Sequence, residues 1–256
     1  MGGGPPLAPT RVMKVRQLID PATSTHTYLV FDPESRAATL IDPVLECVER
    51  DLALIDELGL DLVYIAETHV HADHVTAAGV IRERTGARTV VSARAQVACA
   101  DIGVDHGDRL GFGNLEIRVI ATPGHTAGCV SYLIGDAVFT GDALLVRGCG
   151  RTDFQEGHPE TLYRSITERL FELPDETTVY PGHDYKGRTS STIGEEKRFN
   201  PRLTGKTSDE FCEIMNGLNL APPARIAVAV PANRACGSAN LPNTVPHELK
   251  RVAGWP

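Results

Sequence analysis

A short histidine-rich stretch, residues 68–74, carries the side chains of this sequence that are best suited to chemistry. It places three imidazoles and one carboxylate close together, at His69, His71, Asp73 and His74. His69 and His71 are two positions apart, so in extended backbone both rings project to the same side. Imidazole nitrogen and carboxylate oxygen suit zinc and iron better than calcium or magnesium. The stretch therefore predicts a metal site.

Three further candidate ligands follow glycine-containing turns later in the chain, at His125, Asp142 and His183. Asp142 comes directly after a glycine, so the neighbouring backbone adds no bulk and the carboxylate can approach a cation closely. The seven candidates together are enough ligands for two metal ions. One metal would take His69, His71 and His125, the other Asp73, His74 and His183, with Asp142 shared. An arrangement of this kind would support two-metal hydrolysis.

Apolar runs and glycine-rich turns indicate which elements position these groups. Residues 60–66 form an apolar run that predicts a buried strand directly before His69. The rest of the first half is predicted to hold strands at 12–19, 27–31, 37–41 and 88–92 and helices at 45–58 and 76–84. An antiparallel opening followed by alternating strand and helix is typical of an α/β domain.

The second half is predicted to contain more strands than helices. Its expected strands are 115–121, 129–134, 137–140, 177–180 and 226–230, and its expected helices are 162–170 and 211–218. The last helix follows a capping box that begins at Thr207. We expect residues 1–11 to form a disordered leader, residues 12–236 one catalytic domain, and residues 237–256 a loose tail.

Composition narrows the class of protein. The formal net charge is −8 and no block of lysine or arginine occurs, which disfavours nucleic-acid binding. No apolar run approaches the roughly 20 residues that a membrane span needs. The six cysteines are scattered and form no Cys-x-x-Cys pair, which predicts reduced thiols. We therefore expect a reducing compartment, the cytoplasm or, in a eukaryote, the mitochondrial matrix.

Beyond these physical arguments, the ordered ligand motifs resemble those of the metallo-β-lactamase superfamily. The resemblance is carried by Thr68–His74, by His125 within Thr122–Thr126, by Asp142 after Thr140-Gly141, and by His183 after Pro181-Gly182. It implies an α/β fold of the αββα type, a four-layer sandwich with the metal site at one edge of the two packed sheets. Because this superfamily contains hydrolases, nucleases, oxygen reductases and dioxygenases, the fold alone does not decide the function.

Four outer segments are similar to the persulfide dioxygenase family. They are residues 143–154, 180–185, 199–203 and 229–237. The resemblance implies one Fe(II) per chain, held by a facial triad of His69, His125 and Asp142 with three positions left for substrate and O2. In that case His71, Asp73, His74 and His183 are outer partners or remnants of a second metal site. Asp184 is expected to orient a ligand.

The same resemblance implies the reaction. Glutathione persulfide, O2 and water would give glutathione and sulfite, and the enzyme would be a homodimer that binds neither nucleic acid nor membrane. Because glutathione carries two carboxylates, its site should offer cationic or N–H donors. We therefore expect Arg151, Tyr185 and Arg188 to bind glutathione.

Two alternatives remain open at this stage. A thioesterase of the glyoxalase II type would use the same seven positions for a dinuclear centre that hydrolyses S-acylglutathione. That family carries an additional helical domain, whereas only one helix and one strand are expected after Arg202. The other alternative is a catalytically silent, metal-binding regulatory protein. Metal identity separates the enzymes, because zinc has no redox chemistry.

Overall fold

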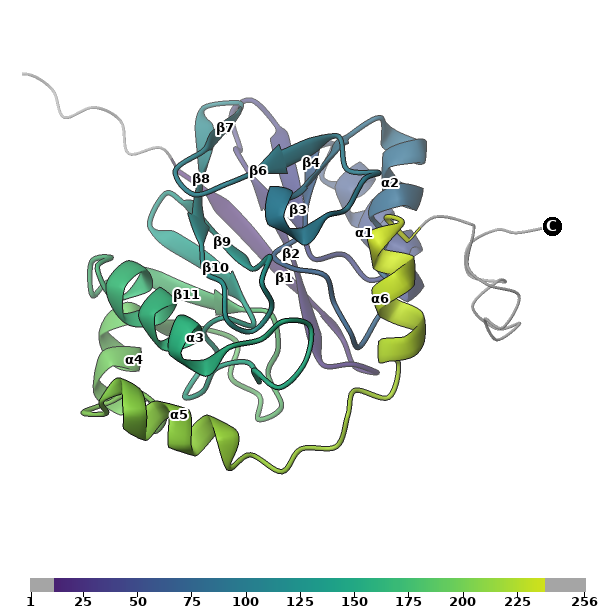
Figure 1. Ribbon diagram of the computed structural model, residues 1–256. Coiled ribbons are helices and arrows are strands. Elements are labelled where there is room, and N and C mark those ends of the chain that lie inside the picture. The colour runs from purple at the N-terminus through teal and green to yellow at the C-terminus, as the bar shows by residue number, and fades with distance from the viewer. Residues whose placement is uncertain (1–11, 238–256) are drawn as a thin grey trace, which may run out of the picture.

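Two β-sheets of six strands each form the centre of the structure, a computed structural model that describes residues 12–237 (Figure 1). The predicted leader, residues 1–11, lies outside the described residues. The same holds for the predicted tail, apart from Gly237.

The first sheet has the strand order β1-β2-β3-β4-β5-β6. Its strands are β1 (Lys14–Asp20), β2 (Thr25–Phe31), β3 (Ala37–Ile41), β4 (Asp61–Ala66), β5 (Arg88–Ser92) and β6 (Ile102–Val104). The first three pair antiparallel, and β3 to β6 pair parallel. The predicted antiparallel opening followed by strand–helix alternation is therefore confirmed. The parallel strands end at one edge, where the loop after β4 carries His69.

The second sheet has the strand order β12-β11-β10-β9-β8-β7. Its strands are β7 (Arg109–Phe112), β8 (Leu115–Ala121), β9 (Val130–Ile134), β10 (Ala137–Gly141), β11 (Thr178–Pro181) and β12 (Ser191–Thr192). Strands β7 to β10 form an antiparallel meander, in which β8, β9 and β10 were predicted and β7 was not, and β11 joins β10 in parallel. His125 lies between β8 and β9, while Asp142 and His183 follow β10 and β11.

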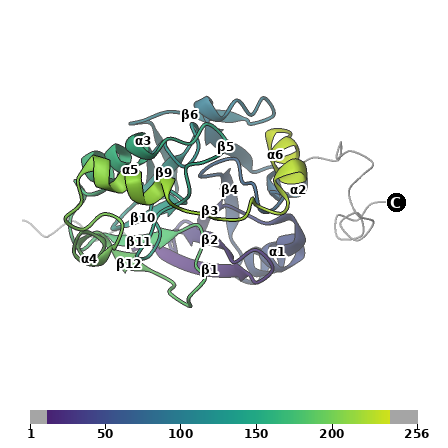
Figure 2. The same ribbon diagram turned by 60° about the horizontal axis from the view of Figure 1, so that its bottom comes forward.

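Helices cover both outer faces of the sheet pair (Figures 1 and 2). They are α1 (Val48–Glu57), α2 (Ala78–Thr85), α3 (Pro159–Ser165), α4 (Ile193–Phe199), α5 (Ser208–Asn216) and α6 (Ile226–Arg234), with 3-10 turns at Leu45–Cys47 and Ala93–Ala95 and a π-helical turn at Ile166–Leu170. Residues from α1, α2 and α6 pack on the first sheet, and residues from α3, α4 and α5 pack on the second. This is the expected αββα sandwich.

The core between the sheets explains why these runs become strands. Tyr28 of β2, Ile117 of β8 and Phe139 of β10 are fully buried there and belong to one apolar cluster. In β8 the exposed Glu116 and Arg118 alternate with buried apolar residues, as the period of a half-buried strand requires. The sheets thus stack face to face, and the edge where their loops meet is left for polar groups.

The predicted strand at 226–230 is wrong, because these residues begin helix α6. Alternating Ile and Val suggested a strand, but tertiary packing overrides that preference. Ala229 and Ala232 are buried, and Val230 packs near Val70 of the histidine-rich stretch. The chain reaches α6 by a long segment, residues 217–225, that crosses from one helix layer to the other (Figures 1 and 2).

The prediction of six reduced thiols is also wrong, because Cys99 and Cys236 form a disulfide. They are separated by 137 positions, so no local spacing pattern could reveal the pair. The other four cysteines are free. The cysteines therefore no longer support a reducing compartment as a group of six free thiols.

Within residues 12–237, no helix has the length and apolar character needed to cross a bilayer.

Candidate metal centre

Three of the predicted ligands meet where the two sheets present their loops. The histidine loop, which we define as residues 67–77 between β4 and α2, supplies His69. The β8–β9 loop supplies His125, and the end of β10 supplies Asp142. The candidate ligand atoms of these three residues all lie within 4.8 Å of one another. Residues up to 73 positions apart in sequence thus form one compact donor set.

Hydrogen bonds on the far side of each ring determine which nitrogen faces the centre. His125 Nδ1 lies 2.7 Å from the carbonyl oxygen of Arg151, which only accepts, so Nδ1 carries the proton. His69 Nδ1 lies 3.0 Å from Thr68 Oγ1, whose hydroxyl donates to Asp42. Each Nε2 is therefore left with a free lone pair. Such outer partners commonly fix the orientation of metal-binding imidazoles.

The protonation states suit a metal ion. Burial lowers the pKa of His125, and burial together with the neighbouring His71 holds the pKa of His69 well below its ordinary value. Burial alone would raise the pKa of Asp142, but the adjacent His183 outweighs it and the pKa is lowered. Neutral imidazoles and an ionised carboxylate are the forms that bind metals. The donor set therefore fits an N,N,O metal site.

Two glycines pack directly against the ligand side chains, where a larger residue would not fit. A Cβ on Gly150 would lie 2.8 Å from His125 Nδ1, and a Cβ on Gly182 would lie 2.8 Å from Asp142 Oδ1. Real Cβ atoms do not approach other atoms this closely, so larger residues would displace the ligands. Gly182, in the turn before His183, and Gly150 thus allow close backbone approach behind the donor set.

The remaining candidates form a second group whose polar atoms contact one another. His183 lies between two carboxylates, with Nδ1 at 2.6 Å from Asp142 and Nε2 at 3.0 Å from Asp73. Asp73 Oδ2 also lies 3.2 Å from His74 Nδ1 and accepts from the Thr25 hydroxyl. Burial would lower the pKa of His183, yet Asp142 and Asp73 raise it well above its ordinary value. The ring therefore links both carboxylates as a cation.

His71 faces a buried acidic pair that the sequence analysis missed. Its Nε2 lies 3.1 Å from Asp42 Oδ1 and 3.4 Å from Glu67 Oε2. Burial alone would lower the pKa of His71, but these carboxylates raise it to about 10. His71, Asp73 and His74 also have candidate ligand atoms within 4.8 Å of one another. Within that set, however, His71 and Asp73 already have oppositely charged partners.

An open cavity of about 520 Å³ leads to the donor set. His69, His125 and Asp142 line it together with Asp73 and His183. The crossing segment, residues 217–225, contributes Leu220, Ala221 and Pro223 to its wall. The volume falls in the range of sites for small molecules. A ligand of that size can therefore reach the three converging groups.

The cavity includes two of the three residues predicted to bind glutathione. Arg151 lines it, but its guanidinium forms a bidentate ion pair with Asp153, with both distances 2.6 Å. Tyr185 is 72% exposed and its ring stacks parallel to that of His183. Arg188 does not line the cavity.

Asp184 also lines the cavity, but its side chain accepts from the amides of Lys186 and Arg188 at 2.9 and 2.5 Å. Among the described residues, no hydrogen bond joins Asp184 to an imidazole. The expectation that Asp184 orients a ligand therefore gains no support from its contacts.

Three cations in the cavity wall were not predicted, and one of them, Arg147, is paired with Glu195 and Glu196. Arg202 lines the cavity and donates to the carbonyl oxygen of Cys149 at 2.6 Å. Lys186 lines it from the loop after β11, with its side chain exposed. Arg202 could have been found, since it falls in the family-like segment 199–203. Lys186 gave no signal, because an isolated lysine in a polar loop is usually a solvated surface residue.

Comparisons with known proteins agree with this geometry. The profile described as "Metallo-beta-lactamase superfamily" matches residues 20–183. "Persulfide dioxygenase ETHE1, mitochondrial" of Mus musculus is 50% identical over 232 residues, 90% of this chain and 91% of that protein. The protein of the same name in Homo sapiens is 51% identical over 226 residues, 87% of this chain and 88% of that protein.

A solved structure gives the same result. The crystal structure of ETHE1 from Myxococcus xanthus is 59% identical, has a TM-score of 0.86, and covers 88% of this chain and 100% of that chain. The ligand motifs, the αββα layers and these likenesses lead to one conclusion. The chain belongs to the metallo-β-lactamase superfamily and, within it, to the persulfide dioxygenase family.

Proposed function

We propose that this protein is a sulfur dioxygenase that acts on glutathione persulfide at a single Fe(II). The persulfide, O2 and water give glutathione, sulfite and protons. The outer sulfur gains three oxygen atoms, two from O2 and one from water, and its bond to the glutathione sulfur is broken. His69, His125 and Asp142 would hold the iron.

One observation carries the proposal of a single metal. The donor atoms of His69, His125 and Asp142 converge within 4.8 Å at a cavity, whereas His183 lies between Asp142 and Asp73 with both ring nitrogens engaged. An N,N,O set with open positions is the facial arrangement that non-haem iron oxygenases use.

Bound iron would supply redox chemistry, since it can coordinate a soft persulfide sulfur and O2 at adjacent positions. The protein's own residues hold the donors for that task. Thr68 and the Arg151 carbonyl oxygen orient the two imidazoles. His183 contacts both Asp142 and Asp73 and offsets part of their negative charge beside the cavity. These contacts keep the set in place before any substrate arrives.

The cavity wall offers positive charge for a substrate with two carboxylates. Lys186 and Arg202 line it, and the side chain of Lys186 has no ion pair among the described residues. We infer that these two side chains take the glutathione carboxylates. Arg151 is less suited to that task than predicted, because Asp153 already neutralises its guanidinium. In this arrangement Tyr185 would border the cavity opening.

A test of the function compares two reactions on anaerobically reconstituted protein. We expect iron-loaded protein to consume O2 and release sulfite when glutathione persulfide is added, with about one iron per chain. S-Lactoylglutathione, a thioester, serves as the control substrate and should not be hydrolysed. Thioester hydrolysis without O2 uptake would instead support the glyoxalase II alternative. Binding of iron with neither reaction would support a regulatory protein.

The thioesterase and the silent regulatory protein are not favoured, because half the residues match persulfide dioxygenases over about nine-tenths of the chain.

We further propose that the enzyme is a homodimer. The mitochondrial names of the relatives support the matrix as its compartment in a eukaryote, and the cytoplasm is its proposed site otherwise. Sedimentation of the purified protein tests the dimer.

A further inference from the structure

Helix α6 contacts the histidine loop in a way that the proposed chemistry does not use. Asn233, near the end of this helix, is 5% exposed. Its Nδ2 donates to the carbonyl oxygens of His71 and His74, both at 2.9 Å. Its Oδ1 accepts from the amide of Thr76 at 2.8 Å. Both donors and the carbonyl of this amide therefore bind the backbone of one loop.

Neighbouring segments hold the flanks of the loop. The amide of Glu67 donates to Val90, and that of Ala77 donates to Pro43, both at 2.9 Å. Among the hydrogen bonds of the described residues, only those from Asn233 reach the carbonyls of His71 and His74. An unpaired buried carbonyl destabilises the conformation that buries it. The carbonyls of His71 and His74 therefore depend on a side chain more than 150 positions away, whereas those of Val70 and Val75 accept from Gln155 and Leu45.

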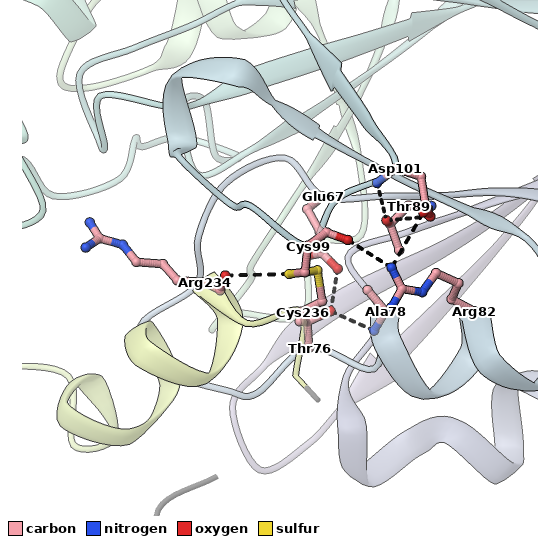
Figure 3. The surroundings of a disulfide bond; sticks show 9 residues. All are labelled: Glu67, Thr76, Ala78, Arg82, Thr89, Cys99, Asp101, Arg234 and Cys236. Atoms are coloured by element: carbon pink, nitrogen blue, oxygen red, sulfur yellow. Dashed lines mark hydrogen bonds and ion pairs between the residues drawn. A yellow bond between two sulfur atoms is a disulfide. The ribbon is translucent and has the colours of Figure 1, made fainter. Parts of the chain in front are cut away.

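The end of α6 is attached to the same region by further contacts. The carbonyl oxygen of Cys236 accepts from the amide of Gly79 in α2 at 2.8 Å. A Cβ on Gly237 would lie 2.0 Å from the Thr76 carbonyl oxygen, so the chain passes directly over the loop. Cys236 is bonded to Cys99, whose carbonyl oxygen accepts from Arg82 of α2 at 2.8 Å (Figure 3). These contacts hold the end of α6, and with it Asn233.

We propose that Asn233 is a positioning residue for the candidate iron site and that the Cys99–Cys236 disulfide locks it in place. The inference rests on the proposed role of His69 as a ligand. The rings of His69 and His71 are only 4.0 Å apart, so a displaced His71 backbone also displaces His69. The disulfide thereby couples the oxidation state of two cysteines to the geometry of the donor set.

The accessible end of the disulfide is Cys99, which is half-buried, whereas Cys236 is 2% exposed. A thiolate of the glutathione class would attack the Cys99 sulfur, and Cys236 would leave as a thiolate and take up a proton. A second thiol then releases Cys99 and forms the small-molecule disulfide. Two thiols are thus oxidised as the protein bond is reduced. The proposal predicts that this exchange loosens the histidine loop.

The first experiment uses metal-free protein and therefore does not depend on the activity. Amide hydrogen exchange of residues 69–76 is compared in wild type and Asn233→Asp, which keeps the size and an acceptor but loses both donors. We expect exchange in this loop to rise by about tenfold or more. Asn216→Asp, at the exposed end of α5, is the matched control and should leave the loop unchanged. Equal exchange in both variants would overturn the proposal.

The second experiment measures release of Fe(II) to a chelator. Asn233→Asp and Cys99→Ser should each release iron about 10–100-fold faster than wild type, as when an outer partner of a ligand is lost. Treatment with a phosphine reductant, which becomes the phosphine oxide as two protein thiols form, should speed release from wild type but not from Cys99→Ser. Cys212→Ser, a free cysteine in α5, is the control.

A spectroscopic readout separates positioning from a general loss of stability. With Co(II) in the site, we expect the ligand-field absorption of Asn233→Asp to differ from that of wild type at a temperature where both are folded. An unchanged spectrum and unchanged iron release would refute the positioning role. If the protein lacks dioxygenase activity but the metal-free loop still loosens, the proposed function fails and the attachment of the loop by Asn233 stands.

Discussion

The two imidazole–carboxylate groups beside the cavity have nearly the same composition but different partners. In the first, His69 and His125 donate from Nδ1 to neutral oxygens, so each ring keeps an unused nitrogen. In the second, His71 and His183 face carboxylates and are held as cations. The comparison teaches that residue type alone does not define a metal ligand. An imidazole can bind a metal only where one ring nitrogen keeps a free lone pair, and the partners of the other nitrogen determine which one that is.

The difference between the two groups is tested most strongly by removing one side chain from each. Asp142→Ala removes the only anionic donor of the first group, so we expect metal binding more than about 100-fold weaker, beyond the usual effect of an outer partner. Activity should disappear with it. His71→Ala should keep most of the iron. Metal analysis after anaerobic reconstitution measures both, and equal losses would indicate a dinuclear centre.

A substitution at the junction of the two groups should have an intermediate effect. His183→Gln removes the cation between Asp142 and Asp73 but no proposed ligand. We expect iron affinity to fall by about 10–100-fold, because the carboxylate loses its orienting partner. Competition with a chelator gives the affinity. If the variant binds as little iron as Asp142→Ala, His183 is itself a ligand.

Within the first group, the Thr68 hydroxyl can be tested by an isosteric change. Thr68→Val removes the oxygen that lies 3.0 Å from His69 Nδ1 and also donates to Asp42. We predict roughly tenfold weaker iron binding, at the low end of effects for outer partners. Thr68→Ser restores the hydroxyl and should restore the affinity. Wild-type affinity in the valine variant would show that the hydroxyl does not orient the ring.

The smallest effect is expected at the outer rim of the second group. Tyr185→Leu removes a ring that stacks on His183 but reaches no proposed ligand. Iron content should stay at the wild-type level, while KM for glutathione persulfide rises by about two- to fivefold, the scale of one aromatic contact. Steady-state O2 uptake and metal analysis measure the two. Loss of iron would mean that the stacking supports the donor set as well.

Local patterns in the sequence predicted most of the sandwich. The alternation in β8 has a period that only a strand satisfies, and the apolar run before His69 is short enough for a buried strand. Gly86 ends α2 in the left-handed conformation. The expected helix at 162–170 is found as α3 and its π-helical continuation. Short elements such as β6 and α4 were missed, because three to seven residues carry too little periodic signal.

The tertiary features were harder to predict. Helix α6 looked like a strand because Ile226 and Val228 alternate with alanine, and only packing against the first sheet shows its true form. All seven candidate ligands lie at the predicted edge of the sheets. Sequence reasoning alone could not divide them into two groups, because the division depends on contacts across loops, such as the contact between His183 and Asp73.

The disulfide has a topological consequence for the whole molecule. By joining Cys99 to Cys236 it closes a covalent ring that contains the entire second sheet, together with His125 and Asp142. A protease that cuts one exposed loop inside this ring opens it without releasing a fragment. The nicked chain migrates as one species until it is reduced, and only then separates into two pieces.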